Sequence, residues 1–460
     1  MHSLGAMARS ERNTYLCRDC GAESPKWAGR CPSCGSWNSL AEEEAPKRRT
    51  TATVNRLVEI DAAGAAVIPT GLEELDRVLG GGFMRGSITV LGGEPGIGKS
   101  TLLLQALSAV ASQGTDVLYV SAEESAAQVR SRANRLREMP ASLWICNDSD
   151  WAKVEAAVAE VSPSFVVVDS IQTVSDAEVG GSAGSLAQVR SCAQRCVEWA
   201  KGPSAMTVIL VGHVTKDGSL AGPRTLEHMV DTVLSFEEGE PLGLRSLRAV
   251  KHRFGRTGEL GLFEMGKKGL RCVGDATSLF LADRRTGQAG DVITPTMDGR
   301  RALMVELQAL TARAGEAGPR RSCQGTDCGR LSAILAVLAR HAGVGLGSTD
   351  VFVSAVGGAK ATEPASDLAV AMAVVSSLSG LPLPEDLVVV GEIGLGGEIR
   401  RPHHLPARLS EAKRAGFGRA VVPASAELSG TGMDLLRVPD VASALSACGI
   451  LPAQRRVRAS

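Results

Sequence analysis

A short stretch of the chain, GGEPGIGKS (92–100), contains the complete phosphate-binding pattern G-x-x-x-x-G-K-[ST]. A strand-like run, SITVL, precedes it, and a helix-like run, TLLLQALSAVA, follows it. In that setting backbone N–H groups of the turn surround a β-phosphate, Lys99 reaches the β and γ oxygens, and Ser100 binds Mg²⁺. We therefore predict an ATP and Mg²⁺ site made of Gly93, Glu94, Pro95, Gly96, Ile97, Gly98, Lys99, Ser100 and Thr101.

Acidic residues at the ends of two other apolar runs suit the chemistry of such a site. Asp169 ends the run FVVVD, where a carboxylate supports Mg²⁺ from its outer coordination sphere or, alternatively, only caps the next helix. Glu123 and Glu124 follow the run YVSA, where a carboxylate is placed to orient the attacking water. We predict Glu123 as the catalytic residue, with a helix-start charge as the alternative, and the sequence leaves the choice between the two glutamates open.

Four of the eleven cysteines form two C-x-x-C pairs with ten residues between them. Each pair can supply two of the four ligands of a tetrahedrally coordinated metal ion. We therefore predict a closed structural Zn²⁺ site made of Cys17, Cys20, Cys31 and Cys34. A redox-active or disulfide-bonded set is the alternative. The seven other cysteines are scattered, and in a cytosolic chain we expect them to be ordinary core thiols.

The bulk composition restricts the class of protein. With 460 residues and 44% hydrophobic residues the chain can bury sizeable cores, and we expect two or three domains. Fifty basic and fifty acidic residues cancel, so any site for a polyanion must be local. No apolar run is long enough to cross a bilayer, and the N-terminal residues lack the apolar core of a signal peptide. We therefore expect a cytoplasmic protein without a membrane partner.

The distribution of residue types predicts an α/β protein with four segments. Residues 10–40 hold the Cys₄ zinc module, and residues 41–66 are charged and read as a linker. Residues 67–275 alternate apolar strand-like runs with helical runs, as in a largely parallel sheet that is covered on both faces. Residues 289–450 mix strands such as DVFVSAV with Ala/Leu-rich helices such as ASDLAVAMAVVSSL, which indicates an α+β domain.

Three stretches resemble known families. TGLEELDRVLGGGFMRGSITVLGGEPGIGKST resembles the opening of the RecA/DnaB-superfamily ATPase core. HVTKDGSLAGPRTLEHMVDTVLSFE and AVKHRFGRTGELGLFEM are similar to the RadA/Sms family of bacterial DNA-repair and recombination proteins, and the order of Cys₄ module, ATPase core and Lon-like end agrees over nearly the whole chain.

The resemblance implies a RecA-like P-loop ATPase that works as a homo-hexameric helicase or translocase on single-stranded DNA. It also implies that branched recombination DNA and the RecA recombinase are partners. The location implied is the bacterial cytoplasm, with association with the nucleoid during repair.

The motif KHRFG carries two cations, Lys251 and Arg253, with His252 where the family has asparagine. The two cations resemble the Lys-x-Arg pair that DnaB-type motors present to the γ-phosphate of the neighbouring subunit. Residues i and i+2 of a strand share a face, so both could reach one phosphate, and we predict both as catalytic residues. A solvated basic strand is the alternative. His252 is expected to point to the opposite face.

Other polar residues near this motif are candidates for contacts with the polymer and the nucleotide. His213 ends the run VILVGH, where the superfamily places a residue that senses the γ-phosphate, and a hydrogen-bonded core histidine is the alternative. Basic residues in and around the motif are candidates for DNA phosphate contacts, with plain surface charge as the alternative. The predicted DNA contacts are Lys216, Arg224, Arg248 and Arg256.

The C-terminal segment, 289–450, resembles the Lon protease domain, which makes an ATP-driven peptidase an alternative function. In the segment EPASD, Ala365 stands where the Lon family has its nucleophilic serine, and Ser366 comes one residue later. The position of the dyad lysine falls at or near Pro406. The Ser–Lys dyad is therefore missing, and Ser366 with Lys360 is the alternative. We expect this domain to assemble a ring instead. A KaiC-type signalling ATPase or kinase and a scaffold that uses ATP only to hold a ring are the remaining alternatives.

Overall fold

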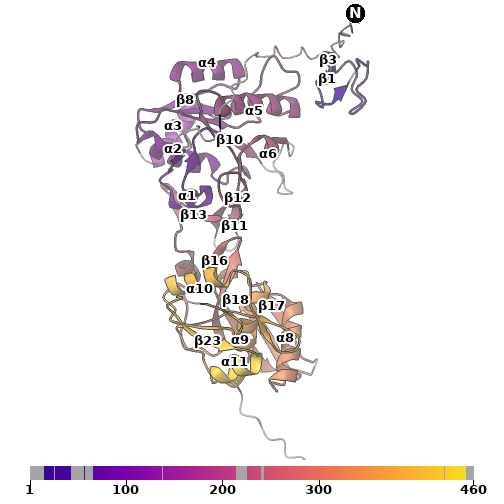
Figure 1. Ribbon diagram of the computed structural model, residues 1–460, viewed down its shortest axis with the longest axis vertical. Helices are drawn as coiled ribbons and strands as arrows, with labels where there is room; N and C mark the ends of the chain where they lie inside the picture. Colours follow the sequence, from indigo (N-terminus) through magenta and orange to yellow (C-terminus); the bar gives the residue numbers. More distant parts are fainter. Residues whose placement is uncertain are drawn as a thin grey trace, which may run out of the picture. The chain divides into compact units, whose positions relative to one another are not determined.

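The computed structural model describes residues 15–24, 26–42, 56, 66–136, 138–213, 225–239, 243–316, 318–428 and 430–451. The chain divides into two compact units. The first comprises Met1–Glu238 and Arg245–Cys272, and the second comprises Gly239–Leu244 and Val273–Ser460. Each unit is described by itself (Figure 1).

The Cys₄ module, residues 15–42, is a small antiparallel sheet with the strand order β2-β1-β3. Strand β1 (Tyr15–Cys17) pairs with β2 (Glu23–Ser24) on one side and with β3 (Leu40–Glu42) on the other. The apolar core of the module is a small cluster around Cys17, Cys31 and Leu40. So small a core cannot hold a fold by itself, which agrees with a module that depends on a bound metal.

A nine-stranded sheet, with the order β14-β13-β12-β11-β6-β10-β9-β7-β8, forms the centre of the first unit. The pairs from β11 to β8 along this order are parallel, and β12, β13 and β14 add antiparallel strands at one edge. The four apolar runs of the sequence are β6, β7, β9 and β10. The strands are β6 (Ile88–Gly93), β7 (Val117–Ser121), β8 (Leu143–Cys146), β9 (Phe165–Asp169), β10 (Thr207–His213), β11 (Thr232–Gly239), β12 (Leu244–His252), β13 (Leu260–Gly266) and β14 (Gly269–Cys272).

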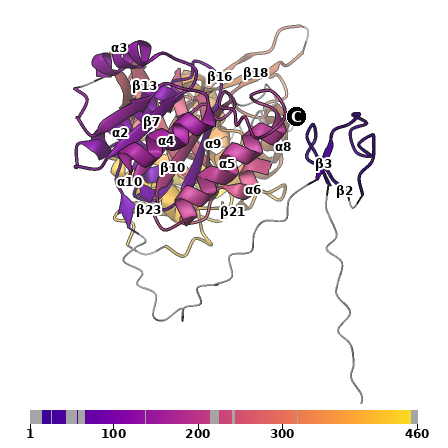
Figure 2. The ribbon, with the colours of Figure 1, turned by 90° about the horizontal axis from the view of Figure 1, so that it is seen from above.

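Helices cover both faces of this sheet, as the alternation of apolar runs predicts. On one face α1 (Glu73–Leu79), α2 (Lys99–Ala111) and α3 (Ala126–Leu136) pack on one core cluster. On the other, α4 (Trp151–Val161), α5 (Leu186–Lys201) and α6 (Thr225–Met229) pack on a second cluster (Figure 2). A two-stranded ribbon, β4 (Val67–Ile68) with β5 (Phe83–Met84), flanks α1. Because parallel strands end at the same edge, the residues that follow β6, β7, β9 and β10 meet there.

The second unit is built on a mixed seven-stranded sheet with the order β17-β18-β16-β15-β19-β22-β23. The long strand β16 pairs antiparallel with β15 and β18, and the remaining pairs are parallel. The strands are β15 (Asp291–Asp298), β16 (Arg301–Arg313), β17 (Arg321–Gln324), β18 (Thr349–Ala355), β19 (Leu387–Val389), β22 (Arg419–Pro423) and β23 (Asp434–Val438). A separate hairpin joins β20 (Glu392–Ile393) to β21 (Ile399–Arg400).

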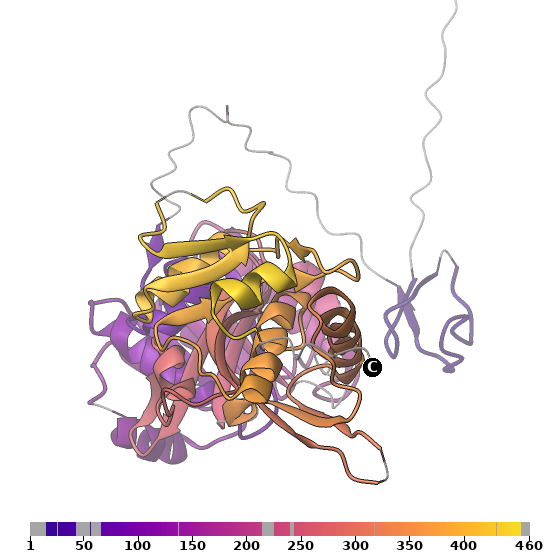
Figure 3. The ribbon, with the colours of Figure 1, turned by 90° about the horizontal axis from the view of Figure 1, so that it is seen from below.

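Helices cover this sheet on two sides as well. The larger core cluster lies under α8 (Cys328–His341), α9 (Asp367–Ser379) and α11 (Val441–Ala447), and α11 contacts both other helices (Figure 3). Helix α10 (Leu405–Arg414) packs on a second cluster. Helix α7 (Ala276–Phe280) and two short 3₁₀ turns, η3 (Val356–Gly358) and η4 (Pro364–Ser366), complete the unit. The unit is α+β, as the sequence predicts.

The cysteine prediction is right for two residues and wrong for two others. Cys192 and Cys196 are buried core thiols on α5. Cys323 and Cys328 form a disulfide instead, because the turn between β17 and α8 brings their Cα atoms to 5.6 Å. In the described part of the chain, no helix has the length and apolar character needed to cross a bilayer.

Candidate nucleotide and metal sites

The phosphate-binding loop joins the end of the buried strand β6 to the start of α2. Gly96 and Gly98 have φ angles of 80° and 113°, which favour glycine. A Cβ atom at Gly93 would lie 2.4 Å from the carbonyl oxygen of Phe236 on the neighbouring strand β11, so only glycine fits there. The glycines of the motif are therefore required by the local backbone.

Lys99 is only 5% exposed and lies against this loop. Its Nζ donates hydrogen bonds to the carbonyl oxygens of Gly93, at 2.7 Å, and Glu94, at 2.9 Å. Burial lowers the pKa of Lys99, and the negative charges of Asp169 and Glu123 oppose that shift. The lysine is thus oriented along the loop, where phosphate oxygens could replace its two carbonyl partners.

Asp169, at the end of β9, accepts two hydrogen bonds on one oxygen. Ser100 Oγ donates to Asp169 Oδ2 at 2.7 Å, and the hydroxyl of Tyr119 donates to the same atom. Tyr119 lies on β7 and is 2% exposed; burial raises its pKa well above the ordinary value, and the charge of Asp169 adds to the shift. The tyrosine is therefore a neutral donor that fixes the carboxylate. Sequence reasoning missed it, although a hydroxyl in the apolar run VLYVS needs a partner.

The structure brings Glu123, Ser170 and His213 together beside the loop. Ser170 Oγ donates a hydrogen bond to Glu123 Oε1, and His213 Nε2 lies 3.2 Å from the same oxygen. Burial raises the pKa of Glu123, but hydrogen bonds from Ser170 and His213 and the charge of Lys99 outweigh it, so the net shift is downward. The carboxylate is therefore ionised at neutral pH. Ser170, like Tyr119, was not predicted.

Glu124 has a different environment from its neighbour. Its carboxylate forms a salt bridge with Arg132 on α3, and its backbone carbonyl accepts hydrogen bonds from Ser121 Oγ and Asn147 Nδ2. The two glutamates, which the sequence could not separate, thus differ in what they contact. Only Glu123 contributes to the electrostatic environment of Lys99.

Lys251 and Arg253 lie at the other end of the sheet from the phosphate-binding loop. The backbone N–H of Arg253 donates to the carbonyl of Asp231 at 3.0 Å, and that of Asp231 donates to the carbonyl of Ile88 at 2.9 Å. Ile88 is the first residue of β6, whereas the loop begins at its last residue, Gly93. The structure therefore does not bring the two cations to the nucleotide site of their own chain.

The side chains of Lys251 and Arg253 contact the segment between α6 and β11. Lys251 Nζ donates to the carbonyl oxygens of Glu227 and Val230, the latter at 2.8 Å. Arg253 Nη1 lies 3.1 Å from Asp231 Oδ1, and the arginine side chain is about half exposed. Burial lowers the pKa of Lys251, and the positive charge of Arg253 lowers it further. The two cations are thus neighbours.

The other predicted basic positions are less informative. His252 Nε2 lies 3.0 Å from the carbonyl of Leu79 and its Nδ1 lies 3.3 Å from Thr232 Oγ1, so it contacts residues that Lys251 and Arg253 do not. Arg248 lies within β12, and Arg256 is exposed in the following loop. Lys216 and Arg224 fall outside the residues that the structure describes.

Arg245, at the start of β12, contacts the phosphate-binding loop directly. Its Nε donates to the carbonyl of Ile97 at 3.2 Å, and its Nη1 forms an ion pair with Glu238 at 2.5 Å. Strand β12 thus begins beside the phosphate-binding loop of its own chain and carries Lys251 near its other end. The sequence places Arg245 among many basic residues, and only the strand pairing distinguishes it.

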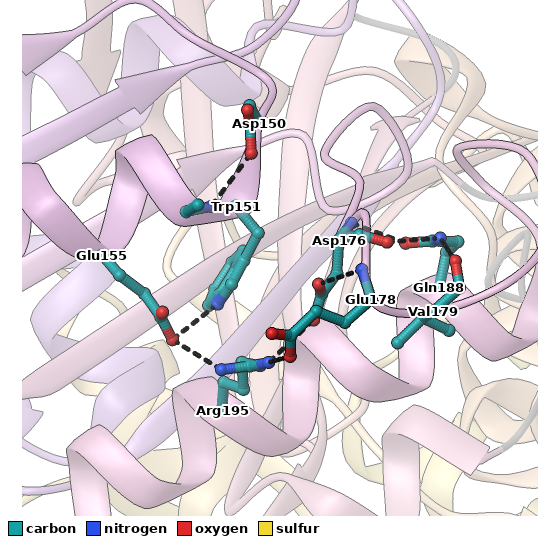
Figure 4. A network of polar contacts seen from close by, with 9 residues as sticks. Asp150, Trp151, Glu155, Asp176, Glu178, Val179, Gln188 and Arg195 are labelled. Carbon is teal, nitrogen blue, oxygen red and sulfur yellow. Dashed lines mark hydrogen bonds and ion pairs between the residues drawn. The ribbon is translucent and has the colours of Figure 1, made fainter.

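A network of charged side chains holds the segment that follows β9 (Figure 4). Gln188 on α5 accepts a hydrogen bond from the backbone N–H of Asp176 and donates to the carbonyl of Val179. Arg195, also on α5, lies 3.0 Å from both Asp176 Oδ2 and Glu155 Oε1. The backbone at Asp176, from which the glycine-rich stretch continues, is therefore held against α5.

The four predicted zinc ligands come together in the Cys₄ module. Their sulfur atoms all lie within 4.8 Å of one another, with Cys17–Cys34 and Cys20–Cys31 at 3.6 Å. A tetrahedral zinc ion with sulfur ligands at about 2.3 Å needs sulfur atoms about 3.8 Å apart, so the residues fit the metal. A glycine with positive φ follows each pair, and its N–H bonds back to the first cysteine: Gly21 to Cys17 and Gly35 to Cys31.

The residues at the Lon-type catalytic positions do not form a dyad. Ser366 is 1% exposed, and no described group hydrogen-bonds to its Oγ. Ala365 is buried, and Lys360 is exposed. Pro406 lies in the first turn of α10. No base therefore activates Ser366 in the described residues.

Two protein-family models match the parts of the chain that contain the phosphate-binding loop and the Cys₄ module. A family model described as an AAA domain matches residues 54–219, and one described as a rubredoxin metal binding domain matches residues 15–42. The DNA repair protein RadA of Bacillus subtilis is 43% identical over 450 residues, which cover 94% of this chain and 98% of that protein. The chain belongs to the RadA family.

Other RadA proteins are similar over comparable lengths. That of Pseudomonas aeruginosa is 46% identical and covers 91% of the chain and 94% of its own length, and that of Mycobacterium tuberculosis H37Rv is 44% identical and covers 94% and 92%. The predictions of family, of an α/β P-loop core and of an N-terminal Cys₄ module are thereby confirmed.

Proposed function

We propose that this RadA-family chain is a DNA-dependent ATPase of DNA repair that moves along single-stranded DNA as a homo-hexamer. We further propose that it processes branched recombination intermediates with the RecA recombinase, in the bacterial cytoplasm and at the nucleoid. The relatives at 43–46% identity bear the name DNA repair protein, which supports the repair role. The AAA domain match and the geometry of Lys99, Ser100 and Asp169 support the use of ATP.

One observation supports the proposal of a ring-shaped homo-oligomer. It is the position of Lys251 and Arg253 relative to the phosphate-binding loop. Strand β6 has six residues and therefore spans about 20 Å. Cations at its far end cannot reach the γ-phosphate of their own chain, but in a closed ring they can face the nucleotide of the next subunit. An arginine in that place stabilises the charge of the transition state and makes hydrolysis depend on the subunit interface.

We assign the remaining roles from the contacts around the loop. Glu123 orients the attacking water, and His213 senses the γ-phosphate through Glu123. The hydroxyl of Ser100 and the carboxylate of Asp169 are hard oxygen donors of the kind that Mg²⁺ prefers, so these residues would hold it. When bound, the ion neutralises charge on the phosphates. Lys216, Arg224, Arg248 and Arg256 are proposed to contact DNA phosphates.

The alternatives have less support. A peptidase needs an activated nucleophile, and Ser366 is buried without a hydrogen-bond partner in the described residues. A KaiC-type signalling ATPase gives no reason for the Cys₄ module. A scaffold that binds ATP without turnover has no use for Glu123 beside the loop.

The proposed function is tested by ATP turnover with and without single-stranded DNA. We expect DNA to raise kcat severalfold, because a motor couples hydrolysis to movement along its polymer. The protein should also bind DNA less tightly as salt rises, because phosphate contacts release counterions. Turnover that is the same with and without DNA over a range of salt concentrations would contradict the motor and favour the signalling alternative.

Replacing one glutamate or the other tests the catalytic assignment. Glu123→Gln is expected to lower kcat about 10²-fold, because general-base catalysis is lost. Glu124→Gln is the matched control, since it removes only the half-exposed ion pair with Arg132, and kcat should stay within about threefold of wild type. Nucleotide affinity, measured with a fluorescent ADP, should be unchanged in both. Equal losses in the two variants would refute the assignment of Glu123.

A further inference from the structure

Two of the chain's five tryptophans lie exposed on the Cys₄ module. Trp27 is 58% exposed and Trp37 is 74% exposed. Single exposed apolar side chains are common on soluble proteins, but two large aromatic side chains grouped on one small module indicate a contact surface. The Zn²⁺ site explains the fold of the module but gives no reason for the two indoles.

The two indole rings lie next to each other. A Cβ atom built on Gly29 would lie 3.9 Å from Trp27 Cη2 and 3.9 Å from Trp37 Cζ3, so the two rings flank the same glycine. The backbone under Trp37 is held by a bridge to Arg30 and by a hydrogen bond from Asn38 N–H to the carbonyl of Gly29, at 2.8 Å. The metal-binding turn from Cys31 to Gly35 lies between these paired segments, so the zinc site supports the backbone that carries Trp37.

A cation lies against one of the two rings. The guanidinium of Arg30 lies 5.8 Å from the centroid of Trp37, and its Nε donates to the carbonyl of Gly35 at 2.8 Å. A cation at that distance covers one face of an indole, and the large exposure of Trp37 leaves another face open. Lys26, next to Trp27 in the sequence, is also exposed.

We propose that Trp27 and Trp37 form a platform on which unpaired bases of single-stranded DNA stack, with Lys26 and Arg30 beside the phosphates. This inference rests on the proposed function and names where the Cys₄ module holds the polymer. Bases in a duplex are already stacked on each other, so exposed rings of this kind select single strands. Flat exposed rings, with the guanidinium of Arg30 against Trp37 and an exposed Lys26 next to Trp27 in the sequence, suit a base and its phosphate better than they suit an apolar peptide.

The charge of the module indicates that stacking, rather than ionic attraction, carries the contact. Between residues 15 and 42 the three basic residues Arg18, Lys26 and Arg30 are balanced by the three acidic residues Asp19, Glu23 and Glu42, and four thiolates around one Zn²⁺ would make the module net negative. A site of this kind contributes affinity that depends little on salt, whereas phosphate contacts weaken steeply as salt rises. Stacking is also tolerant of sequence, because every base has a π-face.

The test compares two DNA ligands and two variants of the full-length protein. The ligands are a single-stranded oligo(dT) and an oligonucleotide of the same length made of abasic sites, which has the phosphates but no bases. The variants are Trp27→Ala/Trp37→Ala and the control Trp144→Ala, which removes an exposed tryptophan from the edge strand β8 of the ATPase core. Affinity is measured by fluorescence anisotropy of labelled DNA at several salt concentrations.

We expect wild type and the control to bind oligo(dT) at least tenfold more tightly than the abasic strand, because each stacked base contributes about one order of magnitude. The double variant should bind both ligands equally, with an unchanged salt slope. Its zinc content and its ATP turnover without DNA should match wild type, which separates lost stacking from a damaged module.

Each outcome decides the proposal. A double variant that keeps the wild-type preference for bases overturns the platform alone, and the two rings would then be assigned to a protein partner. A wild-type protein without measurable affinity for oligo(dT) overturns both the platform and the proposed function. A shallower salt slope in the double variant would show that phosphate contacts are lost together with the rings, which also contradicts stacking.

Discussion

Arg253→Ala is expected to lower kcat for ATP hydrolysis about 10³-fold, while nucleotide affinity stays within about twofold of wild type. The loss should be confined to turnover, because the proposed role of the guanidinium is to stabilise the transition state in a neighbouring subunit and not to bind the nucleotide of its own chain. The measurement is steady-state turnover with saturating ATP and DNA, together with binding of fluorescent ADP.

Removal of Arg253 should leave the fold intact. Its partner Asp231 is buried, and it keeps hydrogen bonds from Lys201 Nζ, at 2.6 Å, and from the backbone N–H of Ile88, at 3.0 Å. Arg271→Ala is a matched control, because it removes an exposed arginine that pairs with Glu264, which is also at the surface. Weakened ADP binding or an unchanged kcat in Arg253→Ala would contradict the assigned role.

Glu363→Ala is expected to destabilise the second unit by about 3–5 kcal/mol, because it leaves Arg408 as an unpaired buried charge. Arg408 is 2% exposed, and its Nη1 and Nη2 each bind one oxygen of Glu363, at 2.6 and 2.5 Å. Carbonyl oxygens of Pro295 and His403 accept its remaining hydrogen bonds. Hydrogen exchange of the β15 and α10 amides, followed by mass spectrometry, measures the free energy of opening.

Two controls make this result specific. Glu398→Ala removes a pair with Arg400 that is exposed on both sides, and it should change the free energy of opening by less than about 1 kcal/mol. Glu363→Leu combined with Arg408→Met should be less destabilising than Glu363→Ala alone, because neither charge is then left unpaired. If Glu363→Ala has no more effect than Glu398→Ala, the pair does not stabilise the unit.

Residues that belong to a continuous motif, or that stand at the end of an apolar strand, could be predicted from the sequence. The phosphate-binding loop is contiguous, and Asp169 and Glu123 each follow an apolar run, so the parallel sheet brings them to one edge. The four zinc ligands were recognisable for the same reason, since two short turns hold them all. Roles for these residues, and the domain boundaries, stay predictions.

Residues whose contacts depend on strand order could not be predicted. From the sequence alone Tyr119 looks like a core aromatic residue, and its contact with Asp169 follows only from the pairing of β7 with β9. Arg245 likewise looks like one of many surface cations, and its contact with the phosphate-binding loop follows only from the position of β12. The sequence indicates that Lys251 and Arg253 share a face but not that they lie at the start of β6. The strand order of the second unit depends on pairing between distant segments, which local patterns do not encode.

The central claim is that each ATP site combines Glu123 of one subunit with Arg253 of the next, and mixed assemblies of two inactive variants test it most directly. Glu123→Gln and Arg253→Ala chains are co-expressed with different tags, and assemblies that carry both tags are purified. Random mixing pairs an intact Glu123 with an intact Arg253 at about one quarter of the interfaces, so turnover should recover to about that fraction of wild type. Doubly tagged assemblies as inactive as either variant alone would contradict a site shared between subunits.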